Sequence, residues 1–158
     1  MDASAISQII FLIILLILSA FFSSAETALT TVNKIRMRTL ADDGNKRAEQ
    51  VLRITDDSHK MLSAILIGNN IVNLSASSLA TTLAIKLWGS VGAGIATGIL
   101  TFLILVFGEI SPKTFATLYA DQISIAYSGI IGFLMKILTP VIFLVNQFSM
   151  GFLFLLHV

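Results

Sequence analysis

Long apolar segments dominate the pattern of hydrophobic and polar positions along this chain. Four of them stand out, at about residues 6–29, 61–85, 91–118 and 121–157. Each is longer than the ~20 residues that a helix needs to cross the hydrocarbon core of a bilayer. The pattern therefore predicts an all-α membrane protein.

The first three apolar segments are predicted to be transmembrane helices, whereas the fourth is open to two interpretations. Segment 6–29 has neither the basic start nor the cleavage motif of a signal peptide, so we expect it to be retained as a span. Segment 121–157 is interrupted by polar residues and by Pro140. It would either cross as a fourth span or lie along the inner surface as a juxtamembrane belt helix, and we expect the latter.

Residues 32–60 hold the main cluster of charge. Seven of the ten basic residues of the chain lie there. Regular apolar positions and a break at Gly44-Asn45 predict two short amphipathic helices at the membrane interface, within about residues 32–58. A solvated charged loop is the alternative. By the positive-inside rule, this segment lies in the cytoplasm and the N-terminus lies outside.

Composition narrows the function classes. Hydrophobic residues make up 56% of the chain and charged residues 12%, with a mean hydropathy of +0.91. Because soluble domains carry about 25% charged residues, we expect the surroundings to be the lipid bilayer, with no role in binding nucleic acid. The absence of cysteine excludes disulfides and thiolate metal sites. Neither an H-E-x-x-H nor a G-x-S-x-G motif occurs, so we expect one membrane domain over residues 1–158 that is not an enzyme.

Five polar side chains within the predicted spans lie at a common depth. The serines and the asparagines each form a pair spaced i, i+4, so both members of a pair share one helix face. With a rise of ~1.5 Å per residue and alternating helix directions, all five fall about 9–18 Å from the cytoplasmic ends of their spans. Polar groups at such depth usually face a partner or a cavity. The five are Ser19 and Ser23 in the first span, Asn69 and Asn73 in the second, and Glu109 in the third.

The third span adds a backbone ligand beside Glu109. Pro112 has no N–H to donate to the carbonyl of Gly108, so this oxygen is expected to be free within the membrane. Carboxylate, carbonyl, amide and hydroxyl oxygens are hard ligands that suit Mg²⁺, Ca²⁺ or Na⁺. The alternatives are that the serines and asparagines only join helices and that Pro112 only bends one. Glu26, nearer the interface, is expected to form a salt bridge with an inner basic residue.

Small residues at regular spacing indicate faces at which helices approach closely. Ser90, Gly94 and Gly98 are spaced by four, and Gly129 and Gly132 by three. Such faces join helices within one subunit or join two subunits, and the sequence does not distinguish these arrangements.

Three motifs resemble the transmembrane domain of the CNNM/CorC magnesium transporters. They are Ser-Ala-Phe-Phe-Ser-Ser-Ala-Glu-Thr-Ala-Leu at 19–29, Gly-Asn-Asn-Ile-Val-Asn at 68–73 and Gly-Glu-Ile-Ser-Pro-Lys at 108–113. The resemblance covers nearly the whole chain, and the three motifs in the right order make it specific.

The resemblance implies a function and an assembly. Members of this family export Mg²⁺ from the cytoplasm in exchange for Na⁺, as homodimers in the cell (inner) membrane with three spans per subunit and an inner belt helix. They continue into a cytosolic nucleotide-binding regulatory region, so this chain is expected to be the membrane part of a longer protein. An ion-sensing membrane scaffold and a passive cation channel are the alternatives. The family's ion site carries onto Ser19, Ser23, Asn69, Asn73, Gly108 and Glu109.

Overall fold

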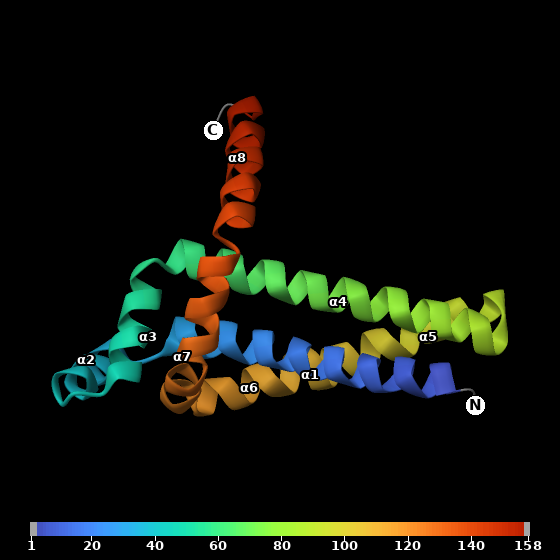
Figure 1. Ribbon diagram of the computed structural model, residues 1–158, viewed down its shortest axis with the longest axis horizontal. Helices are drawn as coiled ribbons and strands as arrows, with labels where there is room; N and C mark the ends of the chain where they lie inside the picture. The colour runs from blue at the N-terminus through green and yellow to red at the C-terminus, as the bar shows by residue number, and fades with distance from the viewer. Residues whose placement is uncertain (1–2, 157–158) are drawn as a thin grey trace.

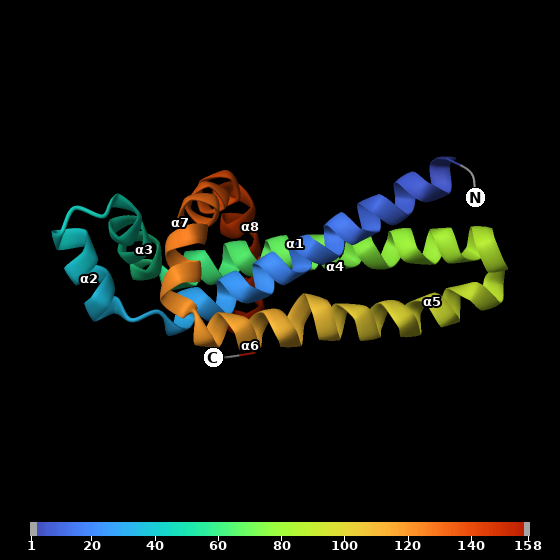
Figure 2. The same ribbon diagram turned by 90° about the horizontal axis from the view of Figure 1, so that it is seen from below.

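Three long helical segments lie side by side in the computed structural model, which describes residues 3–156 (Figures 1 and 2). Each is long and apolar enough to cross a membrane. The predicted all-α fold with three transmembrane helices is therefore confirmed. The first two are α1 (Ala3–Thr31) and α4 (Ser58–Trp88), and the third joins α5 (Ser90–Leu103), the π-helix η1 (Ile104–Ile110) and α6 (Ser111–Leu118).

Helix α1 crosses the bundle at an angle and contacts both other segments, at α4 and at η1 and α6. Its approach to α4 depends on Gly68, because a Cβ built at this position would lie 2.5 Å from the ring atoms Cε1 and Cζ of Phe22. A side chain at position 68 would force the ring of Phe22 to move, so glycine lets this ring rest on the backbone of α4. The contact places this face of α1 directly on α4.

Gly89 makes the turn between α4 and α5 with a backbone φ of +71°. The returning helix stays close, since a Cβ at Gly92 would lie 2.7 Å from the carbonyl oxygen of Ala84. At the same end of the bundle, Lys86 Nζ donates a 2.9 Å hydrogen bond to Ser4 Oγ of α1. The three segments are thus tied together at the end where the chain carries little charge.

The charged stretch forms two short helices rather than a loop. They are α2 (Lys34–Asp42) and α3 (Lys46–Asp56), joined through Gly44 at a φ of +91°. Asparagine side chains cap both of them: Asn33 accepts from the N–H of Arg36, and Asn45 accepts from the N–H groups of Arg47 and Ala48. Asp57 then caps α4 by accepting from the N–H of Lys60. We call this end, where α2 and α3 meet the bundle, the charged end.

The last segment consists of two helices, α7 (Ala120–Ile137) and α8 (Thr139–Leu155), bent by 65°. Together they are apolar enough for one broken span, but both run across the bundle axis at the charged end in Figure 1. Helix α7 packs on α1 and α3, and α8 projects from the bundle. The segment predicted as a belt thus consists of two helices with a bend before Pro140, and the choice between a belt and a fourth span stays a prediction. Its last residue, His157, lies outside the described residues.

Candidate functional site

The centre of the candidate site is the contact between Ser19 of α1 and Gly108 of η1. Ser19 is 1% exposed, and Gly108 is buried. A Cβ built on Gly108 would lie 2.8 Å from Ser19 Oγ, so the hydroxyl rests directly against the glycine backbone. Any side chain at position 108 would occupy the space in front of this hydroxyl. The glycine is thus required by a close approach between two spans.

Five buried side-chain oxygens have no hydrogen-bond partner among the described residues, and three of them belong to predicted site residues: Ser19 Oγ, Ser23 Oγ and Asn73 Oδ1. The other two are Gln8 Oε1 and Ser124 Oγ. The neighbouring hydroxyl of Ser24 is different, because it donates to the carbonyls of Ala20 at 2.8 Å and Phe21 at 3.0 Å. A buried polar group without a partner costs about 1–3 kcal/mol. Ser19 Oγ, Ser23 Oγ and Asn73 Oδ1 are therefore candidates for binding a polar ligand.

Ser19 and Asn73 both border a small cavity of about 80 Å³. Its surface is almost entirely apolar, so the cavity shows that the two residues lie near one another but does not itself form a polar site. Apart from these two polar residues the walls are apolar and come from α1, α4, α5 and η1. They comprise Leu12, Ile13, Leu15, Leu16, Ala76, Leu100, Leu103 and Ile104.

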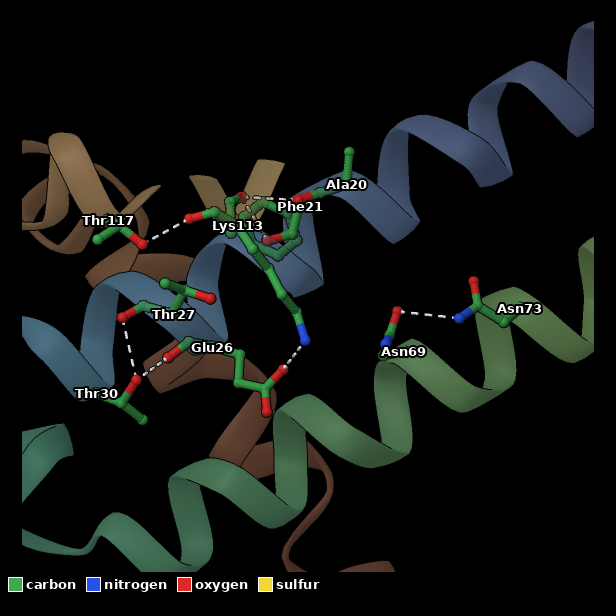
Figure 3. A network of polar contacts seen from close by, with 10 residues as sticks. Ala20, Phe21, Glu26, Thr27, Thr30, Asn69, Asn73, Lys113 and Thr117 are labelled. Carbon is green, nitrogen blue, oxygen red and sulfur yellow. Dashed lines mark hydrogen bonds and ion pairs between the residues drawn. The ribbon is translucent and has the colours of Figure 1, made fainter. Parts of the chain in front are cut away.

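Asn69 and Asn73 lie one turn apart on α4 and interact with each other. The amide Nδ2 of Asn73 donates to Oδ1 of Asn69 at 3.5 Å, the long limit for a hydrogen bond (Figure 3). This contact uses the nitrogen of Asn73 and leaves its oxygen buried without a partner. The predicted pairing of the two asparagines on one face is therefore seen directly, with one amide orienting the other.

Residues 104–110 form a π-helix, which the sequence interpretation did not include. The N–H of Ser111 bonds to the carbonyl of Val106, five residues back instead of four. With this spacing, Pro112 fails to supply a donor to Phe107, and with ordinary α-helical spacing it fails to supply one to Gly108. The spacing therefore decides whether the carbonyl of Phe107 or that of Gly108 lacks this donor. Single π-turns inside α-helices occur frequently at functional sites.

The two carboxylates of the spans have different surroundings. Glu26 Oε2 lies 3.4 Å from Lys113 Nζ of α6, which confirms the expected salt bridge with an inner basic residue (Figure 3). Glu109 follows Gly108 directly, is half-buried, and takes part in no ion pair within residues 3–156. Those residues also contain no cluster of three or more His, Cys, Asp and Glu side chains suited to a metal. The candidate site therefore combines one carboxylate with neutral oxygens.

The structure brings Ser19, Asn73 and Gly108 together from three different spans. Asn69 is connected to this group through Asn73, and Glu109 through the backbone of Gly108. Ser23 lies one turn from Ser19 on α1 and is fully buried. The sequence interpretation missed the π-helix, for which the only signal was the proline four residues after a glycine.

Comparisons with known proteins give consistent results. The family model described as the cyclin M transmembrane N-terminal domain (CNNM) matches residues 10–158. A UPF0053 protein of Haemophilus influenzae is 46% identical over 150 residues, which cover 94% of this chain and 36% of that protein. The UPF0053 inner membrane protein YfjD of Escherichia coli is 41% identical over 132 residues, covering 84% of this chain and 31% of that protein.

More distant relatives extend beyond bacteria. A chloroplastic DUF21 domain-containing protein of Arabidopsis thaliana is 38% identical over 147 residues, covering 92% of this chain and 22% of that protein. The chain therefore spans about a third or less of the length of these three relatives.

Proposed function

This chain belongs to the cyclin M transmembrane domain family, and from that membership and the site described above we propose that it carries Mg²⁺ across the membrane. The direction is export from the cytoplasm, with Na⁺ moving inward in exchange. Under this proposal Mg²⁺ is the cargo, held by oxygens of Ser19, Ser23, Asn69, Asn73 and Glu109 and by the backbone at Gly108.

The observation that carries the proposal is the set of buried oxygens without partners. Ser19 Oγ and Ser23 Oγ belong to α1 and Asn73 Oδ1 to α4, and Ser19 Oγ rests against Gly108 of the third span. Hydroxyl and amide oxygens are ligands for hard cations, whereas soft metals prefer thiolates. A bound cation would supply the interactions that these oxygens lack. The same atoms would otherwise represent several kcal/mol of unexplained cost within one bundle.

A single carboxylate suits a transported ion better than a permanently bound one. Glu26 is neutralised by Lys113, so Glu109 is the acidic side chain of the described spans that is left without a cationic partner. One negative charge only partly balances a divalent cation, which favours release of the cargo. It fully balances Na⁺, so the coupling ion could use the same oxygens in turn.

The π-helix supplies a place at which the third span can change shape. Segments with i→i−5 bonds are less favourable than regular helix and are used for single turns at functional positions. A return of residues 104–110 to α-helical spacing would rotate Glu109 relative to α6. We propose that this rotation accompanies the exchange of access from one side of the membrane to the other.

Liposome flux measurements test the proposal with a matched pair of serines. Ser19→Ala removes an oxygen without a partner, whereas Ser24→Ala removes one that is satisfied within its own helix. We expect Ser19→Ala to reduce Mg²⁺ flux about tenfold or more, as for the loss of one charged interaction, and Ser24→Ala to leave it nearly unchanged. Equal flux in both variants would refute the site.

The alternatives give different results in the same vesicles. A membrane scaffold that senses ions would show Mg²⁺-dependent thermal stabilisation, lost in Glu109→Gln, but no flux. A passive cation channel would show flux that does not respond to an imposed Na⁺ gradient. The exchanger requires flux that the Na⁺ gradient drives and that Glu109→Gln abolishes.

We further propose that α2 and α3 lie in the cytoplasm, with the N-terminus outside the cell (inner) membrane. Seven of the ten basic residues are at the charged end, as the positive-inside rule requires for an inner loop.

A homodimer is proposed on the small-residue face of α5. Gly94 and Gly98 are exposed, and a Cβ built on either would have no atom of this chain within 4 Å. This face is therefore not used to join helices within the subunit, which leaves it for a second copy. Residues outside this chain in longer relatives would then hold any nucleotide-dependent regulation.

A further inference from the structure

A basic pocket lies at the charged end, between α3, the start of α4 and α7, away from the cation site. Its volume is about 440 Å³. Three cationic side chains line it, Arg53, Lys60 and Lys136, against one carboxylate, Asp57. Asp57 already caps α4 by accepting from the N–H of Lys60. The pocket therefore has a net positive charge.

Two of the three cations have no acidic partner. Arg53 pairs with Glu49 on its own helix at 3.2 Å. Lys60 and Lys136 take part in no salt bridge in the part of the chain that the structure describes. Unpaired cations from two helices facing one pocket favour an anion as the occupant.

The remaining walls of the pocket are apolar and continue onto an apolar helix face. Ile54, Phe133 and Met135 line the pocket beside the charges. The outward side of α7 next to it exposes Ile130 by 53%, Phe133 by 62% and Ile137 by 54%. A soluble anion such as free phosphate would leave this apolar surface uncovered, whereas acyl chains would cover it.

The position along the bundle agrees with a lipid headgroup. Lys60 is followed by Met61, which is buried at the start of the long apolar helix α4. The pocket thus lies where the span leaves the hydrocarbon and meets the headgroup region. Basic pockets between helices at this level are places where anionic lipid headgroups bind.

Gly129 keeps part of the pocket open. A Cβ built at this position would have no atom within 4 Å. A Cβ built on the neighbouring Gly132 would instead lie 3.0 Å from Nε2 of Gln50. Gly132 thus joins α7 to α3, while Gly129 leaves space beside it. A large side chain at position 129 would fill the pocket without colliding with the protein.

We propose that this pocket binds the phosphate headgroup of an anionic phospholipid from the leaflet at the charged end, with its acyl chains along α7. Because the lipid would contact side chains of α7 on one side of the pocket and of α3 and α4 on the other, it would hold these helices together. This inference does not depend on the proposed transport of Mg²⁺, because it uses different residues and a different ligand.

Native mass spectrometry of the detergent-solubilised chain tests the inference with phosphatidylglycerol as the probe. We expect one phosphatidylglycerol to remain bound, and phosphatidylcholine at the same concentration not to do so. The double variant Lys60→Gln/Lys136→Gln should weaken retention of the lipid about tenfold or more. The reason is that each basic residue near an anionic surface contributes a similar share of the binding free energy. Gly129→Leu should also abolish it while leaving all charges in place.

A matched control removes the same charge elsewhere. Lys34→Gln/Arg38→Gln lies on exposed positions of α2 that do not line the pocket, and we expect it to retain phosphatidylglycerol. Equal loss in this control would show general attraction to a basic surface and overturn the proposal. So would equal retention of phosphatidylcholine, displacement of phosphatidylglycerol by millimolar inorganic phosphate, or undiminished binding in Gly129→Leu.

Discussion

Substitution of Gly108 by alanine tests the contact on which the candidate site depends. The added methyl would lie 2.8 Å from Ser19 Oγ and 3.4 Å from Ser19 Cβ. Favourable contacts between carbon atoms lie at about 3.5–4.0 Å, so the clash is with the hydroxyl. Overpacking of this kind costs about 1–3 kcal/mol. The higher helix propensity of alanine offsets about 1 kcal/mol of that cost.

A double-mutant cycle separates these two effects. Ser19→Ala removes the clashing oxygen, so the double variant Gly108→Ala/Ser19→Ala should recover the overpacking cost. The propensity change occurs in both arms of the cycle and cancels. We therefore expect a coupling of about 1–3 kcal/mol between the two sites, measured from unfolding free energies without Mg²⁺. Ser19→Ala alone should not destabilise the ion-free protein, because its hydroxyl has no partner to lose.

Ion binding provides the second measurement in the same cycle. A ligand at 100 times its dissociation constant stabilises the folded state by about 2.7 kcal/mol. We expect wild-type protein to gain stability with Mg²⁺ and the double variant to gain little, although its packing is restored. Additive effects within about 0.5 kcal/mol would mean that Ser19 and Gly108 are not in contact. A full Mg²⁺ response in the double variant would mean that the ion binds elsewhere.

Three other substitutions test separate parts of the structure. Pro112→Ala returns an N–H to the third span, so the free energy of unfolding without Mg²⁺ should rise by about 1 kcal/mol. The Mg²⁺-dependent shift in melting temperature should fall, and an unchanged shift would argue against a backbone ligand. Asp121→Ala removes the acceptor of the Asn33 N–H at 3.0 Å, so hydrogen exchange in α2 should accelerate, and unaltered exchange would contradict this contact. Lys46→Cys introduces the sole cysteine; an impermeant maleimide should label it only after permeabilisation, and labelling of intact cells would reverse the proposed orientation.

Under the proposed function, the requirements of ion binding oppose those of stability at the candidate site. The hydroxyl oxygens of Ser19 and Ser23 are buried and have no hydrogen-bond partner among the described residues. The hydroxyl of Ser24, by contrast, donates a hydrogen bond to a carbonyl of its own helix. Replacement of the first two by alanine should favour the ion-free fold and weaken ion binding. The matched replacement of Ser24 should do neither. This contrast distinguishes a ligand from a serine that only packs.

Much of the fold was determined by the sequence alone, because a bilayer makes local pattern decisive. A span must satisfy its backbone hydrogen bonds internally, so a long apolar segment has to be a helix. The three spans follow from this local rule, whereas the two amphipathic helices and the break at Gly44 follow from the pattern of apolar, charged and glycine residues in 32–58. The candidate residues could also be predicted from the local pattern, because a polar side chain deep in an apolar segment costs free energy wherever it occurs.

Only the tertiary structure decided how those residues face one another. Ser23 and Ser24 are identical in type and adjacent in sequence, yet the hydroxyl of Ser23 is buried without a partner whereas that of Ser24 bonds to its own backbone. The π-helix was likewise not evident from the local pattern. Helix rotation and register arise from packing between distant segments, and a one-dimensional pattern does not contain them.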